Sequence, residues 1–381
     1  MSPRDGRPDV AVVGGGYAGL MAAGRLAIGG RSVVLIDPKP HFVHRLELHR
    51  RLAGKATATR AWSRVLPRGV ERLEGRATAW QDGVLGIRTR RGVRELRPRR
   101  VVITTGSRSR NPWREPLVVD LEHLDAARAL VDRDRVVVVG GGATGVETAV
   151  ALARSGHRVT LAAEAFTGVS DAGSDSLRDA LTRIGVTLVR YTVNEVGEGA
   201  AYPAAGSPIP CDAVVPCIGF APSPSARALG LPTDERGRVP VSASLEVAPH
   251  TYAAGDTVCV PSMPWLGGGA ALAMPQGAHV AASILADLAG EPPPPFRFGW
   301  ESKNFDLGGA RGVLQLLESD GTPGLAVVGI RPAVAKALVL AVAPRLARWE
   351  AALGRPLYSW NRGPRLGDDP LRGPGGALPR A

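Results

Sequence analysis

Two short runs of apolar residues, each followed by three glycines, are the clearest feature of the hydrophobic pattern. Residues 10–13 precede Gly14, and residues 136–139 precede Gly140. Each run is typical of a buried β-strand, and each glycine cluster leads into small residues typical of a helix. A strand, a glycine-rich turn and a helix in this order begin a βαβ unit that binds a dinucleotide. Two copies, more than a hundred residues apart, predict two dinucleotides in one redox protein.

The first unit contains the residue types that dinucleotide binding needs. A strand, a helix and a second strand are predicted at residues 9–13, 17–28 and 32–36. Gly14 makes the tight turn, Gly16 lets a pyrophosphate approach the backbone, and Gly19 lets the helix pack against the strand. The positive end of the helix then faces the phosphates. Asp37 ends the second strand and is placed to accept a hydrogen bond from a ribose hydroxyl.

The second unit repeats this order but differs at the acidic position. Its glycines are Gly140, Gly142 and Gly145. Ala163 occupies the place of the acidic residue, and Glu164 follows, so Glu164 is the candidate partner of the 2′-hydroxyl of NAD. No arginine comes directly after the strand to meet a 2′-phosphate, which favours NADH over NADPH.

Strands that end in glycine mark where the chain leaves each unit. The strand at 100–104 leads into Thr105 and Gly106, which let the chain pass close to a cofactor, and residues 212–219 repeat that pattern. The chain then returns with a strand that ends in Gly255 and Asp256. A helix follows, which we expect to begin near Pro275, because proline favours the first helical position, and to include Gln276.

The order of these segments predicts an α/β protein with two Rossmann-like domains, the second inserted in the first, and a smaller C-terminal α+β domain. The C-terminal part is predicted to contain strands at 313–317 and 326–330 and an amphipathic helix at about 332–352. That helix either closes the C-terminal domain, which we favour, or lies on an anionic bilayer. The predicted limits are 1–112 with 234–291 for the first domain, 113–233 for the second, 296–360 for the third, and 361–381 for a disordered tail.

The net charge of +12 and the isoelectric point of about 10.5 come mainly from scattered arginines. We interpret them as a compositional bias, with attraction to an acidic partner as the alternative. No motif for nucleic-acid binding is present, so nucleic acid is not an expected partner. The apolar run at 10–13 is too short for a signal peptide, and no stretch reaches the length of a membrane span. We therefore expect a cytoplasmic protein, or one peripheral to the inner face of a membrane.

Two groups of residues invite a metal or redox interpretation that their spacing does not favour. The chain has no C-x-x-C pair among its three cysteines, Cys211, Cys217 and Cys259, so structural thiols are expected. The segment 40–54 carries three histidines without a carboxylate or cysteine cluster at ligand spacing, so no metal site is expected. A flavin-facing wall or a substrate loop is the favoured interpretation of this segment.

With both glycine loops, the Thr-Thr-Gly exit and the Gly-Asp pair in this order, the chain resembles the two-dinucleotide-binding-domain flavoproteins. Within them it is similar to type II NADH dehydrogenases and apoptosis-inducing-factor-like NADH:quinone reductases, over about residues 8–335. The resemblance implies that FAD is held by Gly14, Gly16, Gly19, Asp37 and Asp256, and NAD(P)H by Gly140, Gly142 and Gly145. It also implies that the helix near Gln276 points its N-terminus at the flavin O2 edge.

One residue is a candidate for a direct part in the reaction. Glu147 matches a glutamate near the contact between nicotinamide and flavin; a buried helical glutamate tied to a backbone amide is the alternative. For Asp256, the alternative is a helix cap. The cysteine pair of the disulfide reductases is absent, and residues 303–311 resemble the relatives' corresponding segment only loosely.

The leading hypothesis is an FAD-dependent NAD(P)H:acceptor oxidoreductase that passes hydride from nicotinamide C4 to flavin N5 and then reduces a quinone or a small organic acceptor. The alternatives are a tailoring oxidoreductase of specialised metabolism, a reductase of an acidic ferredoxin or rubredoxin, and a non-catalytic flavin-bearing sensor. For the ferredoxin reductase, the positive charge would make turnover fall steeply with salt. A homodimer is a further expected form of the protein.

Overall fold

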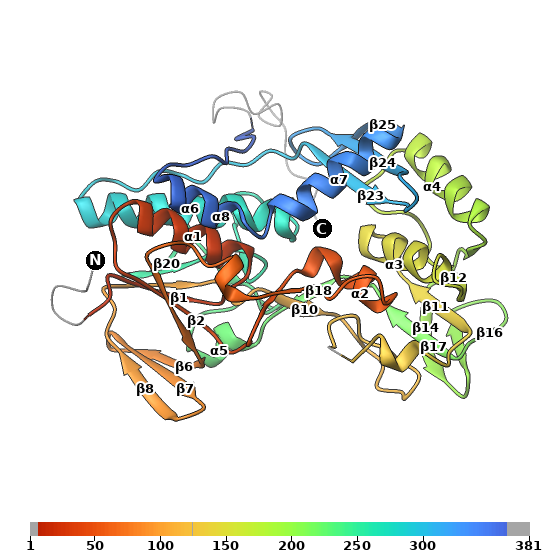
Figure 1. The fold of residues 1–381 in the computed structure, drawn as a ribbon, viewed down its shortest axis with the longest axis horizontal. Helices are drawn as coiled ribbons and strands as arrows, with labels where there is room; N and C mark the ends of the chain where they lie inside the picture. Colours follow the sequence, from red (N-terminus) through yellow and green to blue (C-terminus); the bar gives the residue numbers. More distant parts are fainter. Residues whose placement is uncertain (1–6, 124, 364–381) are drawn as a thin grey trace.

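Two mainly parallel sheets organise the computed structural model, which describes residues 7–123 and 125–363 (Figure 1). The larger sheet has six strands in the order β20-β21-β9-β1-β2-β5. Their bounds are β1 (Val10–Val13), β2 (Val33–Asp37), β5 (Val70–Glu74), β9 (Arg100–Ile103), β20 (Glu246–Ala248) and β21 (Thr251–Ala253). The smaller sheet has four strands in the order β13-β12-β11-β17. Their bounds are β11 (Arg135–Val139), β12 (Arg158–Ala162), β13 (Thr187–Val189) and β17 (Ala213–Pro216).

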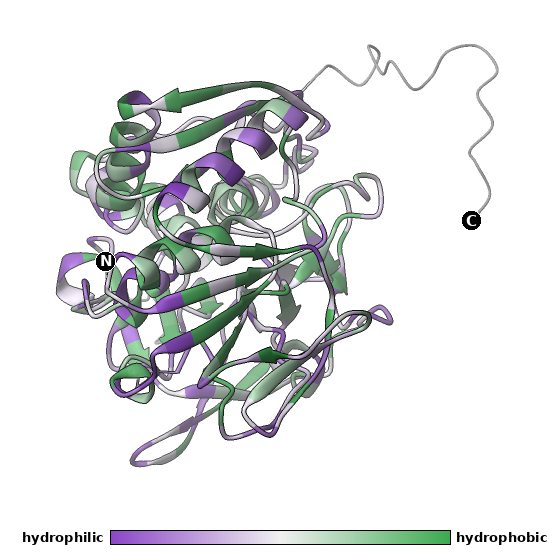
Figure 2. Ribbon diagram, turned by 90° about the vertical axis from the view of Figure 1, so that its right-hand side faces the viewer, coloured by the Kyte–Doolittle hydropathy of each residue, from purple (hydrophilic) through white to green (hydrophobic). Residues whose placement is uncertain are grey.

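The larger sheet is built from two parts of the chain that are far apart in sequence. β21 pairs in parallel with β9, with Thr251 opposite Val101, after the whole second sheet has been formed from the residues in between. This order is the insertion of one Rossmann-like unit into the other that the sequence predicts. Figure 2 shows apolar residues concentrated along the central strands, as expected for parallel sheets covered on both faces.

The two crossings between the sheets lie side by side. β10 (Ser107–Ser109) pairs antiparallel with β18 (Phe220–Pro222), with Ser107 opposite Pro222. The chain therefore leaves the first unit and returns to it along one two-stranded ribbon. β10 lies just before the predicted limit at 113, whereas β18 lies at 220–222, inside the predicted limit at 233. Both limits stay predictions.

The helix α1 (Tyr17–Ile28) packs against α6 (Ala270–Ala289) on one face of the larger sheet. The expected start of α6 near Pro275 is wrong, because the helix begins five residues earlier and Pro275 lies inside it. A Cβ atom on Gly277 would lie 2.2 Å from the Ala18 carbonyl oxygen, so the two helix backbones are nearly in contact. We attribute the earlier start to this packing, which offsets the hydrogen bond that proline cannot donate.

His279 makes the stability of this packing sensitive to acid. The side chain is buried on α6, and Nε2 lies 3.0 Å from the Pro294 carbonyl oxygen. Burial lowers the pKa of the His279 imidazole to about 4, whereas an unfolded histidine has a pKa of about 6.5. Between these values the unfolded chain binds a proton that the folded chain does not. The free energy of unfolding is therefore expected to fall as pH falls from 6.5 to 4, by about 3 kcal/mol in total.

Urea unfolding at pH 7 and pH 4.5 measures this loss. The matched variant His279→Gln keeps a donor for the Pro294 carbonyl but has no proton to gain. It should lose distinctly less stability on acidification than the natural protein. An equal acid-induced loss in both proteins would contradict the assignment to His279.

The C-terminal part forms an antiparallel sheet with two helices. Its elements are β23 (Ser302–Asp306), β24 (Gly312–Leu317), β25 (Pro323–Gly329), α7 (Ile330–Val342) and α8 (Leu346–Leu353). The strands expected at 313–317 and 326–330 correspond to β24 and β25, and β23 was not predicted. The single helix expected at 332–352 is wrong, because the helix is interrupted at residues 343–345. Pro344 has no N–H to donate, so it cannot continue the hydrogen bonding of the helix.

The two C-terminal helices pack on different neighbours. α7 packs on the three-stranded sheet and buries Pro332, Lys336 and Leu340. α8 packs on α1, where the Arg25 guanidinium holds the Glu350 carboxylate at 2.5 and 2.8 Å. The tail predicted to be disordered falls, from residue 364 onward, outside the described residues. Among the helices that are described, none is long and apolar enough to cross a membrane.

Candidate functional site

The first glycine loop leaves open space at one glycine and close packing at the other two. Gly14 has a φ of +108°, and a Cβ atom there would lie 2.3 Å from the Thr104 carbonyl oxygen. A Cβ atom on Gly19 would lie 1.9 Å from the Gly14 carbonyl oxygen. A Cβ atom on Gly16, which directly precedes α1, would meet nothing within 4 Å. The helix N-terminus therefore faces an open space bounded by backbone.

The second glycine loop has the same construction. Gly140 has a φ of +122°, and its Cβ atom would lie 2.3 Å from the Cys217 carbonyl oxygen. A Cβ atom on Gly145 would lie 1.9 Å from the Gly140 carbonyl oxygen. For Gly142, before the helix α3 (Ala143–Ala153), the nearest atom would be Thr167 Oγ1 at an ordinary 3.4 Å. Both loops thus fit the pyrophosphate of a dinucleotide at the middle glycine.

The two acidic residues predicted to bind ribose differ in their surroundings. The buried Asp37 carboxylate accepts hydrogen bonds from the amides of Gly15 and Lys39, each at 2.8 Å. Two bonds leave acceptor capacity on a carboxylate, so a ribose hydroxyl still fits there. Glu164 is exposed beyond β12 and accepts a hydrogen bond from the Thr192 hydroxyl. Asp37 therefore contacts its glycine loop directly, through the Gly15 amide, whereas the bond from Thr192 holds Glu164.

The predicted residues at the crossing and at the return strand meet around Asp256. Its carboxylate accepts from the Ser107 hydroxyl at 2.7 Å and from the Gly269 amide at 2.7 Å. Asp256 therefore ties the exit after β9 to the residue before α6. This geometry contains the helix-capping contact that the sequence left as an alternative, and the role in cofactor binding stays a prediction.

Gly255 and Thr257, the neighbours of Asp256 in the chain, also make hydrogen bonds. The Gly255 amide donates to Gln276 Oε1 at 2.7 Å, and the hydroxyls of Thr105 and Thr257 lie 3.4 Å apart. Gly106, after the first exit strand, has a φ of +67°. Gln276 lies in the second turn of α6 and not at its start, so the expectation that it marks the helix N-terminus is wrong.

Glu147 lies in a buried cluster of charged side chains. Its carboxylate lies 2.8 Å from Lys336 Nζ and accepts from the Asp306 amide at 2.9 Å, and His49 Nδ1 lies 3.8 Å away. The hydrogen bond from the Asp306 backbone amide is the structural role that the sequence analysis kept as an alternative. A catalytic role for Glu147 stays a prediction. Burial lowers the pKa of the His49 imidazole, so His49 is neutral near pH 7. Of the partners of Glu147, the sequence analysis missed Lys336 and Asp306. It named the segment 40–54, which carries His49, but not His49 as a partner of Glu147.

His44 and two of the three cysteines, Cys211 and Cys217, have structural surroundings. His44 lies 2.6 Å from the Tyr17 hydroxyl through Nδ1 and 2.9 Å from the Leu340 carbonyl oxygen through Nε2. Burial raises the pKa of the Cys217 thiol to about 12 and that of Cys211 to about 11, so neither is a thiolate at neutral pH. In the described part of the chain, no group of three or more potential ligands is placed to hold a metal ion.

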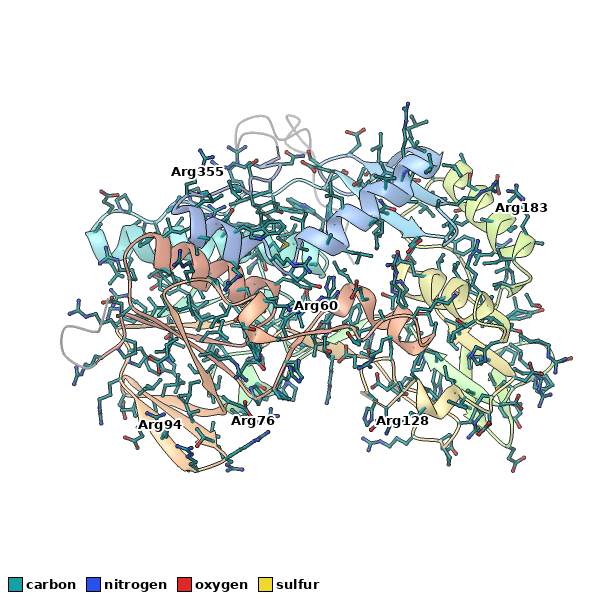
Figure 3. All side chains as sticks on the ribbon, in the orientation of Figure 1. Arg60, Arg76, Arg94, Arg128, Arg183 and Arg355 are labelled. Carbon is teal, nitrogen blue, oxygen red and sulfur yellow. The ribbon has the colours of Figure 1, made fainter. Side chains whose placement is uncertain are left out.

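The positive charge is spread over the molecule. The six arginines labelled in Figure 3 lie on widely separated parts of the surface. Several arginines are paired with carboxylates, among them Arg60 with Glu47 at 2.7 Å and Arg183 with Asp179 at 3.6 Å. This distribution agrees with a compositional origin of the charge more than with a single docking surface.

Comparison with known proteins identifies the family. The profile described as Pyridine nucleotide-disulphide oxidoreductase matches residues 8–283. The chain is 34% identical over 163 residues to an NADH oxidase of Thermoanaerobacter brockii, which covers 40% of this chain and 24% of that protein. It is 30% identical over 151 residues to ferroptosis suppressor protein 1 of Taeniopygia guttata, which covers 38% of this chain and 40% of that protein. The matches therefore span about a quarter to two fifths of these relatives' lengths.

Solved structures show the same fold over most of the chain. A NAD-dependent persulfide reductase from A. fulgidus matches with a TM-score of 0.68 and 23% identity, over 81% of this chain and 63% of that chain. A covalent putidaredoxin reductase–putidaredoxin complex matches with a TM-score of 0.65 and 24% identity, over 89% of this chain and 94% of that chain. The family implies FAD and NAD(P)H as the cofactors, as the sequence predicts.

Proposed function

Because this chain belongs to the pyridine nucleotide-disulphide oxidoreductase family, we propose that it is an FAD-dependent NAD(P)H:acceptor oxidoreductase. The observation that carries the proposal is the pair of glycine loops. In each, two glycines are packed against backbone, while the glycine before the helix has room for a methyl group: nothing lies within 4 Å at Gly16, and the nearest atom at Gly142 is Thr167 Oγ1 at 3.4 Å. A protein that bound one dinucleotide would need this construction once.

The proposal gives the chain's residues the task of alignment. When both cofactors are bound, they supply hydride transfer from nicotinamide C4 to flavin N5, a step that depends on positioning more than on a strong acid or base. Gly14, Gly16, Gly19 and Asp37 would hold FAD, and Gly140, Gly142, Gly145 and Glu164 would hold NAD(P)H. Glu147 is the proposed catalytic residue, and its bonds to Lys336 and to the Asp306 amide fix the direction of its carboxylate.

Anaerobic stopped-flow with the FAD-loaded protein tests this proposal. We expect NADH to bleach the flavin absorbance near ~450 nm rapidly, and NADPH to do so at least ~10-fold more slowly, because Glu164 repels a 2′-phosphate. The matched variant Gly142→Ala has room for its methyl group, with Thr167 Oγ1 at 3.4 Å, and should keep FAD but lose most of the bleaching. Flavin that neither nucleotide bleaches would contradict the proposed function, and faster bleaching by NADPH would contradict the role of Glu164.

A quinone or a small organic molecule is the proposed acceptor. A protein acceptor is the second candidate, because the chain aligns with 94% of a chain in a covalent putidaredoxin reductase–putidaredoxin complex. Turnover with an acidic ferredoxin or rubredoxin would then fall steeply with salt. The third proposal is that the acceptor is a specialised metabolite, which the protein would modify as a tailoring oxidoreductase.

The exposed face of α7 is relevant to two further proposals, membrane contact and a homodimer. α7 exposes Ile330, Val334 and Leu338, at a spacing of four residues, on the side away from its sheet. Contact with the inner face of a membrane and formation of a homodimer each remain proposals that would cover such a face. The packing of the opposite side of α7 agrees with the role that we favoured, closure of the C-terminal domain.

A further inference from the structure

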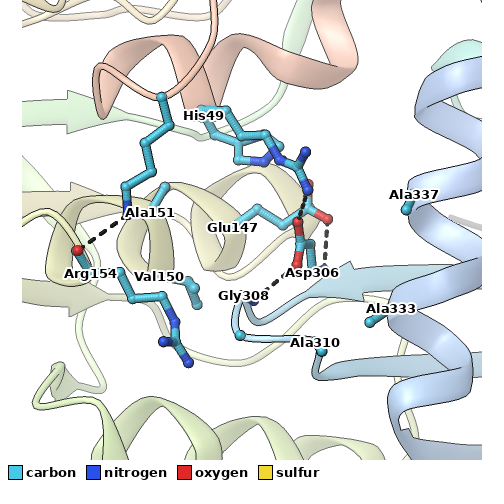
Figure 4. Close-up of a pocket in the computed structure, with 13 residues that line it drawn as sticks. His49, Glu147, Val150, Ala151, Arg154, Asp306, Gly308, Ala310, Ala333 and Ala337 are labelled. Atoms are coloured by element: carbon cyan, nitrogen blue, oxygen red, sulfur yellow. Dashed lines mark hydrogen bonds and ion pairs between the residues drawn. The ribbon is translucent and has the colours of Figure 1, made fainter.

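A cavity of about 400 Å³ lies between the second Rossmann-like unit and the C-terminal sheet (Figure 4). Its walls come from α2 (Leu48–Leu52), α3, the turn between β23 and β24, and α7. The apolar part of the lining comes from two walls, with Val150 and Ala151 on α3 and Ala333 and Ala337 on α7. A space of this size and shape suits a small organic molecule.

The cavity is separate from the second glycine loop. Gly142 precedes the first residue of α3, whereas Arg154 follows the last, and the cavity is lined by Val150, Ala151 and Arg154 at that far end. At 1.5 Å per helical residue, Gly142 and Arg154 are about 18 Å apart along the axis. The cavity thus extends from Glu147, in the middle of α3, to the end of the helix that lies away from the glycine loop.

Three cations line the cavity, and two of them have no carboxylate partner among the described residues. Arg50 is paired with Asp306 at 2.5 Å. Lys55 Nζ donates to the Arg154 carbonyl oxygen at 3.2 Å, and Arg154 Nε donates to the Leu307 carbonyl oxygen at 3.0 Å. Carbonyl oxygens do not neutralise a full positive charge, so the rim formed by Lys55 and Arg154 favours an anion.

A buried polar atom lies at the inner end of the same cavity. His49 lines the cavity and is 5% exposed, yet its Nε2 has no hydrogen-bond partner among the described residues. A buried nitrogen without a partner costs about 1–3 kcal/mol, which a bound polar group would offset. Glu147, beside Nδ1 of the same ring, is already held by Lys336 and by the Asp306 amide, so His49 is the residue at this end with an unused polar atom.

We propose that this cavity binds a small organic anion, with its carboxylate or phosphate group between Lys55 and Arg154, its apolar body against the alanines of α3 and α7, and a polar atom at His49 Nε2. The binding itself depends only on side chains that line the cavity.

Binding of naphthalene derivatives to the oxidised FAD-loaded protein tests the proposal. 2-Naphthoate, 1-naphthyl phosphate and the uncharged 2-naphthamide have the same apolar body, and their dissociation constants are measured by calorimetry. We expect at least one anion to bind at least tenfold more tightly than the amide, and the better anion tells carboxylate from phosphate. Equal affinity of all three, or no binding by either anion, overturns the proposal.

Variants assign the binding to this cavity. Lys55→Met keeps the length of the side chain and should weaken anion binding at least tenfold while leaving the amide unchanged. Arg183→Met removes an exposed cation from α4 (Asp171–Arg183) with the same change in net charge, and should leave all three constants unchanged. Equal losses in the two variants, or none in Lys55→Met, overturn the proposal.

The rate of flavin bleaching by NADH in the same variants keeps the two proposals apart. Anion binding that depends on Lys55 supports the cavity even if NADH does not reduce the flavin. Rapid bleaching without anion binding supports the proposed function and rejects the cavity.

Discussion

Gly19→Ala is expected to lower the free energy of unfolding by about 3 kcal/mol and to abolish FAD binding. The added methyl group would lie 1.9 Å from the Gly14 carbonyl oxygen and 2.8 Å from Thr104 Oγ1. Neither is the free end of a flexible side chain, so α1 must move away from β1 and β9. Overpacking of this kind costs roughly 1–3 kcal/mol or more, and the shift also opens the turn that binds the phosphates. Urea unfolding and the FAD content of the purified protein measure the two effects.

Gly16→Ala is the matched control in the same loop. Residue 16 has a φ of −77°, which alanine adopts freely, and the methyl group would meet nothing within 4 Å. The stability of the FAD-free variant should therefore stay within ~0.5 kcal/mol of the natural protein. Its FAD affinity should fall at least tenfold, because the methyl group occupies the space left for the pyrophosphate. Normal FAD affinity in Gly16→Ala, or normal folding of Gly19→Ala, would contradict this account of the loop.

The second large effect is expected at the buried ion pair between α3 and α7. Lys336→Met should lower the free energy of unfolding by about 3–5 kcal/mol, because it leaves the Glu147 carboxylate buried without its cation. The side chains of Lys336 and Glu147 are 11% and 6% exposed, and their charged atoms are 2.8 Å apart. The Asp306 amide and the neutral His49 do not replace a full charge.

A double-mutant cycle separates the pair from simple loss of packing. Lys336→Met combined with Glu147→Gln should recover much of the lost stability, because no uncompensated charge remains. Lys303→Met is a suitable comparison, because Lys303 Nζ contacts the Thr167 carbonyl oxygen at 3.3 Å, and it should cost less than about 1 kcal/mol. Strictly additive effects of the first two substitutions would show that the pair contributes nothing as a pair.

Local patterns predicted the glycine loops because every requirement lies within a few residues. A run of β-branched residues, a glycine at the turn and small residues in the first helical turn follow one another in sequence. The insertion of one unit in the other was predictable for the same reason, because the strand that leaves each unit ends in a glycine close by in sequence.

Elements that depend on distant contacts were not predictable in this way. α6 starts before Pro275 where it packs closely on α1, and a proline signal read alone places the start too late. β23 has one fully buried residue, Phe305, among polar neighbours, so its hydrophobic pattern is weak.

The charged cluster is the extreme case of dependence on distant contacts. It joins His49, Glu147, Asp306 and Lys336, which come from four separate segments. Each of them alone is an ordinary polar residue of a helix or strand, so no local pattern identifies the group. The sequence predicts a functional role for Glu147, which stays a prediction, and gives no sign of its partners.

The nested order of the strands has a consequence for the synthesis of the protein. β9 is complete at Ile103, but its neighbour β21 begins at Thr251, and the α6 helix that covers α1 ends at Ala289. The second sheet, at residues 135–216, is made in between as one continuous stretch. At ~5–20 residues per second, the first sheet waits roughly 7–30 s for its last strands. During this interval the inserted unit folds on the ribosome while the apolar face of α1 is still uncovered, and this is when the nascent chain most needs a chaperone.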